Sequence, residues 1–142
     1  MKMISVLGQR IDKQYLLSKL YEMGFDEESA EDELEYLINY LYELSNPIEL
    51  YRIISVDNKK DIDTKKPGSH YSISKKDLLK SYSFCTGCGD EIYLLTVESP
   101  KELIDISQTL ANRILYPNEQ EITLKNKGKG TEVIKITKVN TE

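Results

Sequence analysis

The chain has few of the features that build disulfide frameworks, membrane anchors or nucleic-acid surfaces. It contains two cysteines in 142 residues, too few for a disulfide framework. Acidic residues outnumber basic ones by 24 to 19, so no basic excess favours nucleic acid or an anionic membrane as a partner. No apolar run is long enough for a signal peptide or a membrane span. We therefore expect a cytoplasmic protein that binds neither nucleic acid nor membrane.

Internal repeats, low-complexity tracts and domain linkers are also absent from the sequence. The hydrophobic fraction of 39% and the charged fraction of 30% are typical of a globular protein that can build its own core. We expect one α+β domain over residues 1–142. It divides into a helical N-terminal subregion, 1–46, and a core, 47–142.

The N-terminal subregion has the pattern of two packed helices. Apolar residues recur at helical spacing from Ile11 to Met23, and Gly24 is a suitable end for that helix. Asp26 can cap a second helix, which carries one apolar stripe and ends before Pro47. These features predict a helical hairpin.

Beyond residue 47 the apolar pattern changes to the alternation of strands. In residues 48–56 Arg52 shares one face with four aliphatic residues. A buried arginine must be paired or bind an anion, because an unpaired buried charge costs several kcal/mol. The alternative is an edge strand from which Arg52 reaches outward to water.

Residues 70–74, HYSIS, form a second strand-like segment with Ser72 and Ser74 on one face. Two hydroxyls on one face either meet solvent or hydrogen-bond beside a ligand. Ser74 can also cap a short helix in the segment KKDLLKSY.

The second half of the chain contains a central strand, a helix and two further strands. EIYLLTV is the most apolar strand. Ser99, Pro100 and Glu102 form a capping box with a proline start, so we expect a helix from there to about Asn112. Residues 120–125 and 131–139 then form a hairpin around the turn NKGKG.

Two glutamates open the first strand of that hairpin. Glu119 and Glu121 lie at i and i+2, so in a strand they share one face at roughly 7 Å. Two like charges are tolerated side by side if each meets a different cationic partner.

These motifs follow a known order: an arginine in the first strand, Ser-x-Ser in a later strand and Glu-x-Glu near the end. The order resembles the Arg–Ser–Glu class of mono-ADP-ribosyltransferases, toxin-like bacterial and phage proteins that move ADP-ribose from NAD+ to a protein. The resemblance covers about two thirds of the chain. It implies a mixed or antiparallel split sheet around an NAD+ cleft.

The resemblance also implies residue roles. Arg52 matches the arginine that anchors NAD+, Ser72 the serine that supports the catalytic glutamate, and Ser74 a more structural serine. Glu121 matches the catalytic glutamate. Glu119 matches the acceptor-engaging position, where a glutamate resembles the arginine-modifying members. The target-recognition loop matches residues 111–118, with Tyr116.

Other interpretations remain open. The same fold could be an inactive protein-binding module, or an NAD glycohydrolase in which water replaces the protein acceptor. We expect no metal site, because the pair Cys85 and Cys88 supplies only half of the usual four zinc ligands. His70, the only histidine, is expected on the surface or in a loop.

Overall fold

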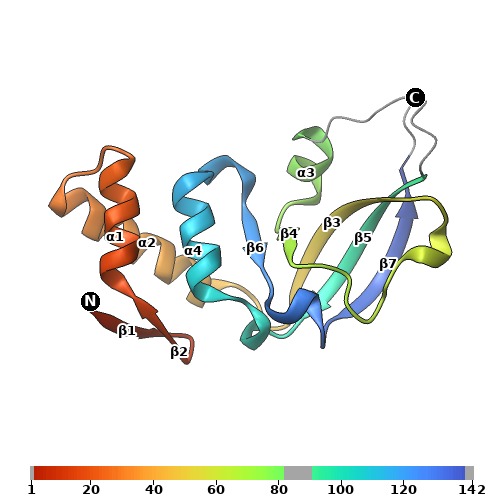
Figure 1. Cartoon of the computed structure of the whole chain (residues 1–142), viewed down its shortest axis with the longest axis horizontal. Helices are drawn as coiled ribbons and strands as arrows, with labels where there is room; N and C mark the ends of the chain where they lie inside the picture. Colours follow the sequence, from red (N-terminus) through yellow and green to blue (C-terminus); the bar gives the residue numbers. More distant parts are fainter. Residues whose placement is uncertain (1, 82–90, 140–142) are drawn as a thin grey trace.

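The N-terminus forms a β-hairpin before the first helix. In the computed structural model, which describes residues 2–81 and 91–139 (Figure 1), β1 (Met3–Val6) pairs antiparallel with β2 (Gln9–Asp12). Leu7 and Gly8 connect them with φ values of 48° and 79°, as a two-residue hairpin turn requires. The expectation of helix from Ile11 was therefore wrong, because four-residue strands are too short to reveal their own period.

The expected pair of helices follows. α1 (Lys13–Glu22) ends before Gly24, which has a φ of 100°, and α2 (Glu27–Glu43) begins after Asp26. Asp26 Oδ1 accepts a hydrogen bond from the Ser29 amide at 2.8 Å, and Ser29 Oγ accepts one from the Asp26 amide at 3.0 Å. This reciprocal capping box confirms Asp26 as the helix start.

Five strands form the main sheet, in the order β6-β4-β3-β5-β7, and every pairing is antiparallel. Their bounds are β3 (Ile48–Val56), β4 (His70–Ser72), β5 (Glu91–Ser99), β6 (Glu121–Thr123) and β7 (Glu132–Lys138). The α+β class is confirmed, and the apolar β5 is paired on both sides.

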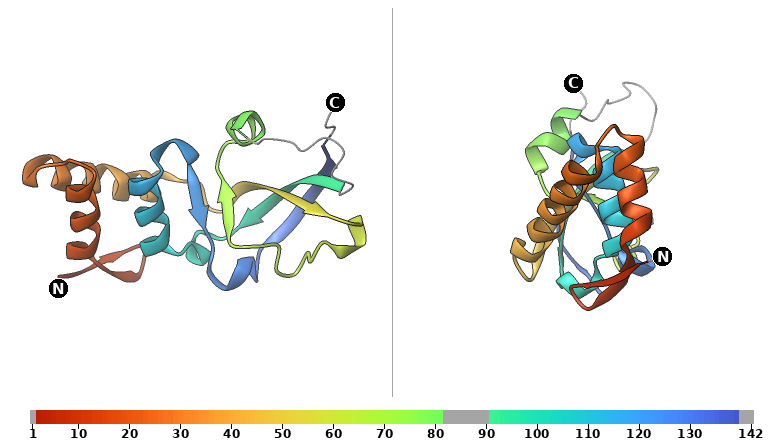
Figure 2. Two further views of the ribbon diagram at one scale, coloured as in Figure 1. Left: turned by 45° about the horizontal axis from the view of Figure 1, so that its top comes forward. Right: turned by 90° about the vertical axis from the view of Figure 1, so that its left-hand side faces the viewer.

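The contact between β3 and β4 is much smaller than the other strand pairings. β3 pairs with β5 along nine residues and β4 pairs with β6 along three. In contrast, β3 and β4 meet at one pair alone, Tyr51 opposite Ser72. The β4–β6 ribbon therefore diverges from the β3–β5–β7 sheet (Figure 2).

The expected capping box at Ser99 does not start a helix. β5 continues through Ser99, whose hydroxyl donates to the Pro100 carbonyl at 3.0 Å. A single 3-10 turn, Lys101–Leu103, follows, and α4 (Ile106–Leu115) begins after Asp105. Asp105 Oδ1 accepts from the Gln108 amide at 3.1 Å. The helix thus begins later than expected and extends past Asn112.

A long-range contact explains this later start. The Gln9 side chain donates to the Ile104 carbonyl at 2.6 Å and accepts from the Ile106 amide at 3.2 Å. A residue of the N-terminal hairpin therefore fixes the backbone just before α4, which no local capping pattern could reveal.

The expected C-terminal hairpin was also wrong, because β6 and β7 lie at opposite edges of the sheet. Between them Asn126 and Lys127 adopt left-handed φ values of 50° and 56°. The Lys127 carbonyl accepts from the Gly68 amide at 2.9 Å. This contact ties the connection to the loop before β4 instead of closing a tight turn.

α4 joins the two ends of the molecule. It contacts α1 and α2 on one side and β6 on the other, and Figure 1 shows it between the first two helices and the sheet. One continuous hydrophobic core results, whose fully buried members include Leu16, Leu20, Leu34, Leu41, Leu50, Leu95, Ile106, Leu110, Ile122 and Leu124. The placement of β6, and with it Glu121, therefore depends on packing against α4.

Candidate functional site

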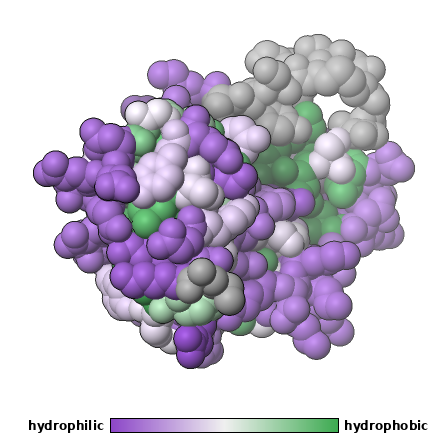
Figure 3. Space-filling model, turned by 60° about the vertical axis from the view of Figure 1, so that its left-hand side comes forward, coloured by the Kyte–Doolittle hydropathy of each residue, from purple (hydrophilic) through white to green (hydrophobic). Residues whose placement is uncertain are grey.

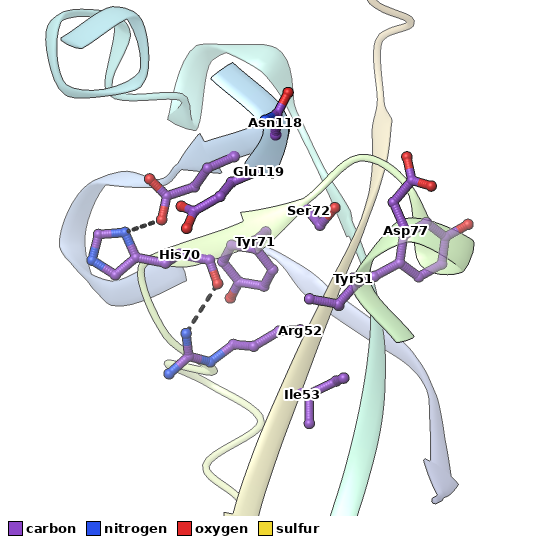
Figure 4. Close-up of a pocket in the computed structure, with 11 residues that line it drawn as sticks. Tyr51, Arg52, Ile53, His70, Tyr71, Ser72, Asp77, Asn118 and Glu119 are labelled. Carbon is purple, nitrogen blue, oxygen red and sulfur yellow. Dashed lines mark hydrogen bonds and ion pairs between the residues drawn. The ribbon is translucent and has the colours of Figure 1, made fainter. Parts of the chain in front are cut away.

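A cavity of about 390 Å³ opens where β3, β4 and β6 approach α3 (Lys75–Ser81) (Figure 4). Its lining comprises Tyr51, Arg52, Ile53, His70, Tyr71, Ser72, Asp77, Leu78, Asn118, Glu119 and Glu121. Because β3 and β4 diverge from a single pair, side chains from both faces of these strands reach the same space.

Four of the five site residues named from the sequence line this cavity. Arg52, Ser72, Glu119 and Glu121 come from separate segments that the fold brings together. Ser74 is outside the lining, and its hydroxyl accepts from the Asp77 amide at 3.1 Å. Ser74 therefore caps α3, as its alternative role predicted.

One nitrogen of the Arg52 guanidinium is hydrogen-bonded, and another is buried without a partner among the described residues. Its Nη1 donates to the His70 carbonyl at 3.0 Å, and Figure 4 shows this contact beside the cavity. Its Nε is buried without a hydrogen-bond partner among the described residues. The guanidinium lies directly over Gly68, where a Cβ would be 2.5 Å from Nε. Arg52 also lines the cavity, and a guanidinium is a planar fork of charged donors suited to binding an anion.

Tyr71 lines the cavity beside Arg52. Its ring is buried, and its hydroxyl donates to the Gly68 carbonyl at 2.8 Å. Burial raises the pKa of Tyr71 to about 12, against a smaller opposing effect of the Arg52 charge. Tyr71 is therefore a neutral wall of the site at physiological pH.

Ser72 and Glu121 lie in one row across the sheet. Ser72 pairs with Tyr51 on one side and with Glu121 on the other, so the three residues share a face. The Ser72 hydroxyl accepts from the Ser74 amide and donates to the Ser74 carbonyl, both at 3.2 Å. Ser72 thus shapes the end of β4 while its backbone places Glu121 opposite.

The Glu121 carboxylate is held from two sides. Its Oε1 is 3.0 Å from His70 Nδ1, and its Oε2 accepts from Asn112 Nδ2 at 2.5 Å. Its side chain is only 20% exposed. His70 is exposed, as expected, but lies in a strand and contacts the candidate catalytic group.

The sequence interpretation did not anticipate these two partners. His70 precedes Ser72 by two residues, so strand alternation alone places it on the face that Ser72 shares with Glu121. Asn112 carries no local signal, because its reach to Glu121 depends on how α4 packs over β6.

Glu119 and Glu121 do not stand on one strand. Glu119 ends a 3-10 turn, Pro117–Glu119, and Gln120 adopts a left-handed conformation with a φ of 50°. The expectation of a simple i, i+2 strand pair was therefore wrong. Gln120 Nε2 donates to Asp77 Oδ2 at 2.5 Å, which fixes the turn to α3 while both glutamates line the cavity.

No family model, curated protein or solved structure matches the chain. No helix in residues 2–81 or 91–139 is both long and apolar enough to cross a membrane. Cys85 and Cys88 lie outside the described residues.

Proposed function

We propose that this protein transfers ADP-ribose from NAD+ to a protein acceptor, an arginine side chain, and releases nicotinamide. One observation carries the proposal. Arg52, Ser72 and Glu121, the three residues of the Arg–Ser–Glu pattern, come from three adjacent strands and line one cavity. The divergence of β3 from β4 also accords with the split sheet that the resemblance implies.

Glu121 supplies the electrostatic part of the reaction. Breaking the bond between ribose C1′ and the nicotinamide nitrogen sends the electron pair to nicotinamide and leaves positive charge on the ribose. A fixed carboxylate beside that charge lowers the barrier more than a mobile one, because no reorganisation is needed during the reaction. The two hydrogen-bonding contacts of Glu121 provide this fixation.

Arg52 supplies the binding part. NAD+ carries two phosphates, and a guanidinium offers them a planar fork of donors. Arg52 lines the cavity, so its guanidinium can meet such an anion there. A cavity of about 390 Å³ is within the usual range for small-molecule sites, about 300–1,000 Å³.

Glu119 serves the acceptor. The side-chain nitrogen of the acceptor arginine forms the new bond to C1′ and loses a proton, and a second carboxylate can orient the guanidinium and take that proton. Glu119 lines the same cavity and is exposed. Tyr116, three residues before Glu119, is 56% exposed, and we assign it to contact with the acceptor protein.

The test compares wild type with Glu121→Gln and Glu119→Gln, which remove charge at nearly constant shape. Nicotinamide release from NAD+ is measured with a free guanidino acceptor and with a bacterial lysate, and modified proteins are identified by mass spectrometry. We expect Glu121→Gln to lower turnover by about 100-fold or more. Glu119→Gln should lower transfer to the acceptor more than nicotinamide release.

The matched control is Glu132→Gln, which removes an exposed carboxylate on β7 outside the cavity. It should behave like wild type. NAD+ consumption without labelling of any acceptor would replace the transferase by an NAD glycohydrolase. No consumption under any of these conditions would contradict both enzymes and favour an inactive binding module.

A further inference from the structure

The Glu121 carboxylate receives one contact on each oxygen, from two different elements. His70 in β4 approaches Oε1 at 3.0 Å, and Asn112 in α4 donates to Oε2 at 2.5 Å. A carboxylate oxygen can accept more than one hydrogen bond, so both oxygens retain capacity for a substrate hydroxyl. The carboxylate is therefore held in place and can still accept further hydrogen bonds.

The orientation of the Asn112 amide is itself fixed. Asn112 Oδ1 accepts from Gln108 Nε2 at 3.2 Å, so Nδ2 must point towards Glu121. The same Nδ2 is 3.3 Å from Thr123 Oγ1. Thr109 Oγ1 accepts from the Thr123 amide at 3.0 Å, which locks α4 to β6 beside this contact. These contacts fix the Asn112 side-chain amide with Nδ2 facing Glu121.

His70 forms the solvent-exposed contact to Glu121. Its ring is 57% exposed, and Nδ1 is the ring nitrogen that contacts Glu121. The other charged side chains that line the cavity are Arg52, Asp77 and Glu119. Arg52 donates to the His70 backbone carbonyl at 3.0 Å.

We propose that His70 and Asn112 are positioning residues for Glu121. This inference rests on the proposed function. A neutral imidazole with its proton on Nδ1 donates to Glu121 and leaves the full carboxylate charge for the developing positive ribose.

The kinetic test uses His70→Asn and His70→Ala. Asparagine retains a donor near the position of Nδ1 but does not titrate, whereas alanine removes the donor. We expect His70→Ala to lower kcat by roughly 10- to 100-fold with little change in KM for NAD+. We expect His70→Asn to recover most of kcat.

A second readout does not depend on turnover. His70 is the only histidine, so its ring nitrogens can be observed without assignment by 15N NMR. At pH 8 we expect the Nδ1-protonated tautomer in wild type, loss of that tautomer in Glu121→Ala, and its retention in the control Glu119→Ala. Asn112→Ala should retain the His70 tautomer and lower kcat, since it removes the opposite contact.

The two readouts separate failure of this inference from failure of the proposed function. If wild type does not consume NAD+ but the tautomer depends on Glu121, the proposed function fails and the contact stands. If wild type consumes NAD+ and His70→Ala keeps the wild-type kcat, the positioning role is overturned. A tautomer that is the same in Glu121→Ala and wild type overturns the contact itself.

Discussion

At the scale of single residues, Gly68 determines where the Arg52 guanidinium lies. Gly68 has a φ of 133°, which side-chain-bearing residues rarely adopt, and a Cβ there would be 2.6 Å from Arg52 Cζ. The guanidinium is the mobile end of its side chain, so it would swing aside and lose its contact with the His70 carbonyl. The backbone conformation at Gly68 and the position of the Arg52 guanidinium are thus coupled.

Gly68→Ala should therefore have two separable effects. Backbone strain should lower the free energy of unfolding by about 1–3 kcal/mol, and displacement of Arg52 should weaken NAD+ binding by about tenfold or more. The control is Gly24→Ala, at a φ of 100° with no atom within 4 Å of the added Cβ. It should show the strain alone. Urea unfolding and NAD+ titration measure the two effects, and equal NAD+ affinity in both variants would contradict the coupling.

Tyr71 predicts a pH dependence of stability. Its pKa is about 12 in the folded protein and 10.0 ordinarily, because burial disfavours the charged phenolate. The stabilisation is complete below pH 10 and is lost as the pH rises towards 12.

Tyr71→Phe isolates this effect. At pH 8 the variant should lose about 1 kcal/mol with the hydrogen bond to Gly68. Between pH 10 and pH 12 wild type should lose stability that the variant keeps, so the difference in free energy of unfolding should shrink. A difference that stays constant across this range, measured by urea unfolding, would show that Tyr71 is not the buried group we describe.

At the scale of elements, α4 carries a contact from its first turn to the candidate site. Asp105 caps the Gln108 amide, and the Gln108 side chain orients Asn112, which donates to Glu121. The α4 helix cap is therefore linked through α4 to the Glu121 carboxylate on β6.

Asp105→Ala should lower stability by about 1 kcal/mol through loss of the cap. It should also lower NAD+ turnover, because Gln108 and Asn112 lose their fixed geometry. Asp12→Ala removes the equivalent cap of α1, where Asp12 accepts from the Gln14 amide at 3.1 Å far along the chain from the site. That control should lose similar stability and keep wild-type turnover per folded molecule. Equal turnover in the two variants would contradict the link through α4.

The sequence predicted some elements well and others poorly, for identifiable reasons. Asp26 and its helix were predictable because a capping box and a long apolar stripe agree within one segment. The start of α4 was not, because the side chain of Gln9 fixes the backbone before it. The path of residues 120–139 was not predictable either. Asn126 and Lys127 adopt left-handed conformations, and the chain crosses there to the opposite edge of the sheet.

The candidate site shows the same division. The order of the Arg, Ser-x-Ser and Glu-x-Glu motifs along the chain identified four residues that line one cavity, because each motif lies on or beside a strand of the same sheet. His70 and Asn112 entered only with the structure. Their contacts with Glu121 depend on strand register and on helix packing, and neither is encoded within a short segment.

At the scale of the whole molecule, the charge is unevenly distributed. α2 contains seven acidic residues and no lysine or arginine, whereas the net charge of the chain is only −5. Figure 3 shows a mostly hydrophilic surface over this helical end. The acidic helix α2 and the candidate cavity thus lie on different parts of the molecule.

The continuous core predicts that both ends unfold together. Leu34 in α2 is fully buried, so Leu34→Ala should lower the free energy of unfolding by about 2–5 kcal/mol. Hydrogen exchange should show the amides of β3 and β5 losing protection along with the helices. Ile134→Ala, at a side chain that is 46% exposed, should have little effect. Helices that lose protection while the sheet keeps it would contradict a shared core.

If β3, β4 and β6 form one NAD+ site, as we propose, NMR mapping of NAD+ on the 15N-labelled protein should locate it there. We expect the largest shift changes at the amides of Arg52, Ser72 and Glu121 and their strand neighbours, and much weaker changes with Arg52→Ala. Saturable changes confined to residues outside this cavity, or no changes at millimolar NAD+, would contradict the account.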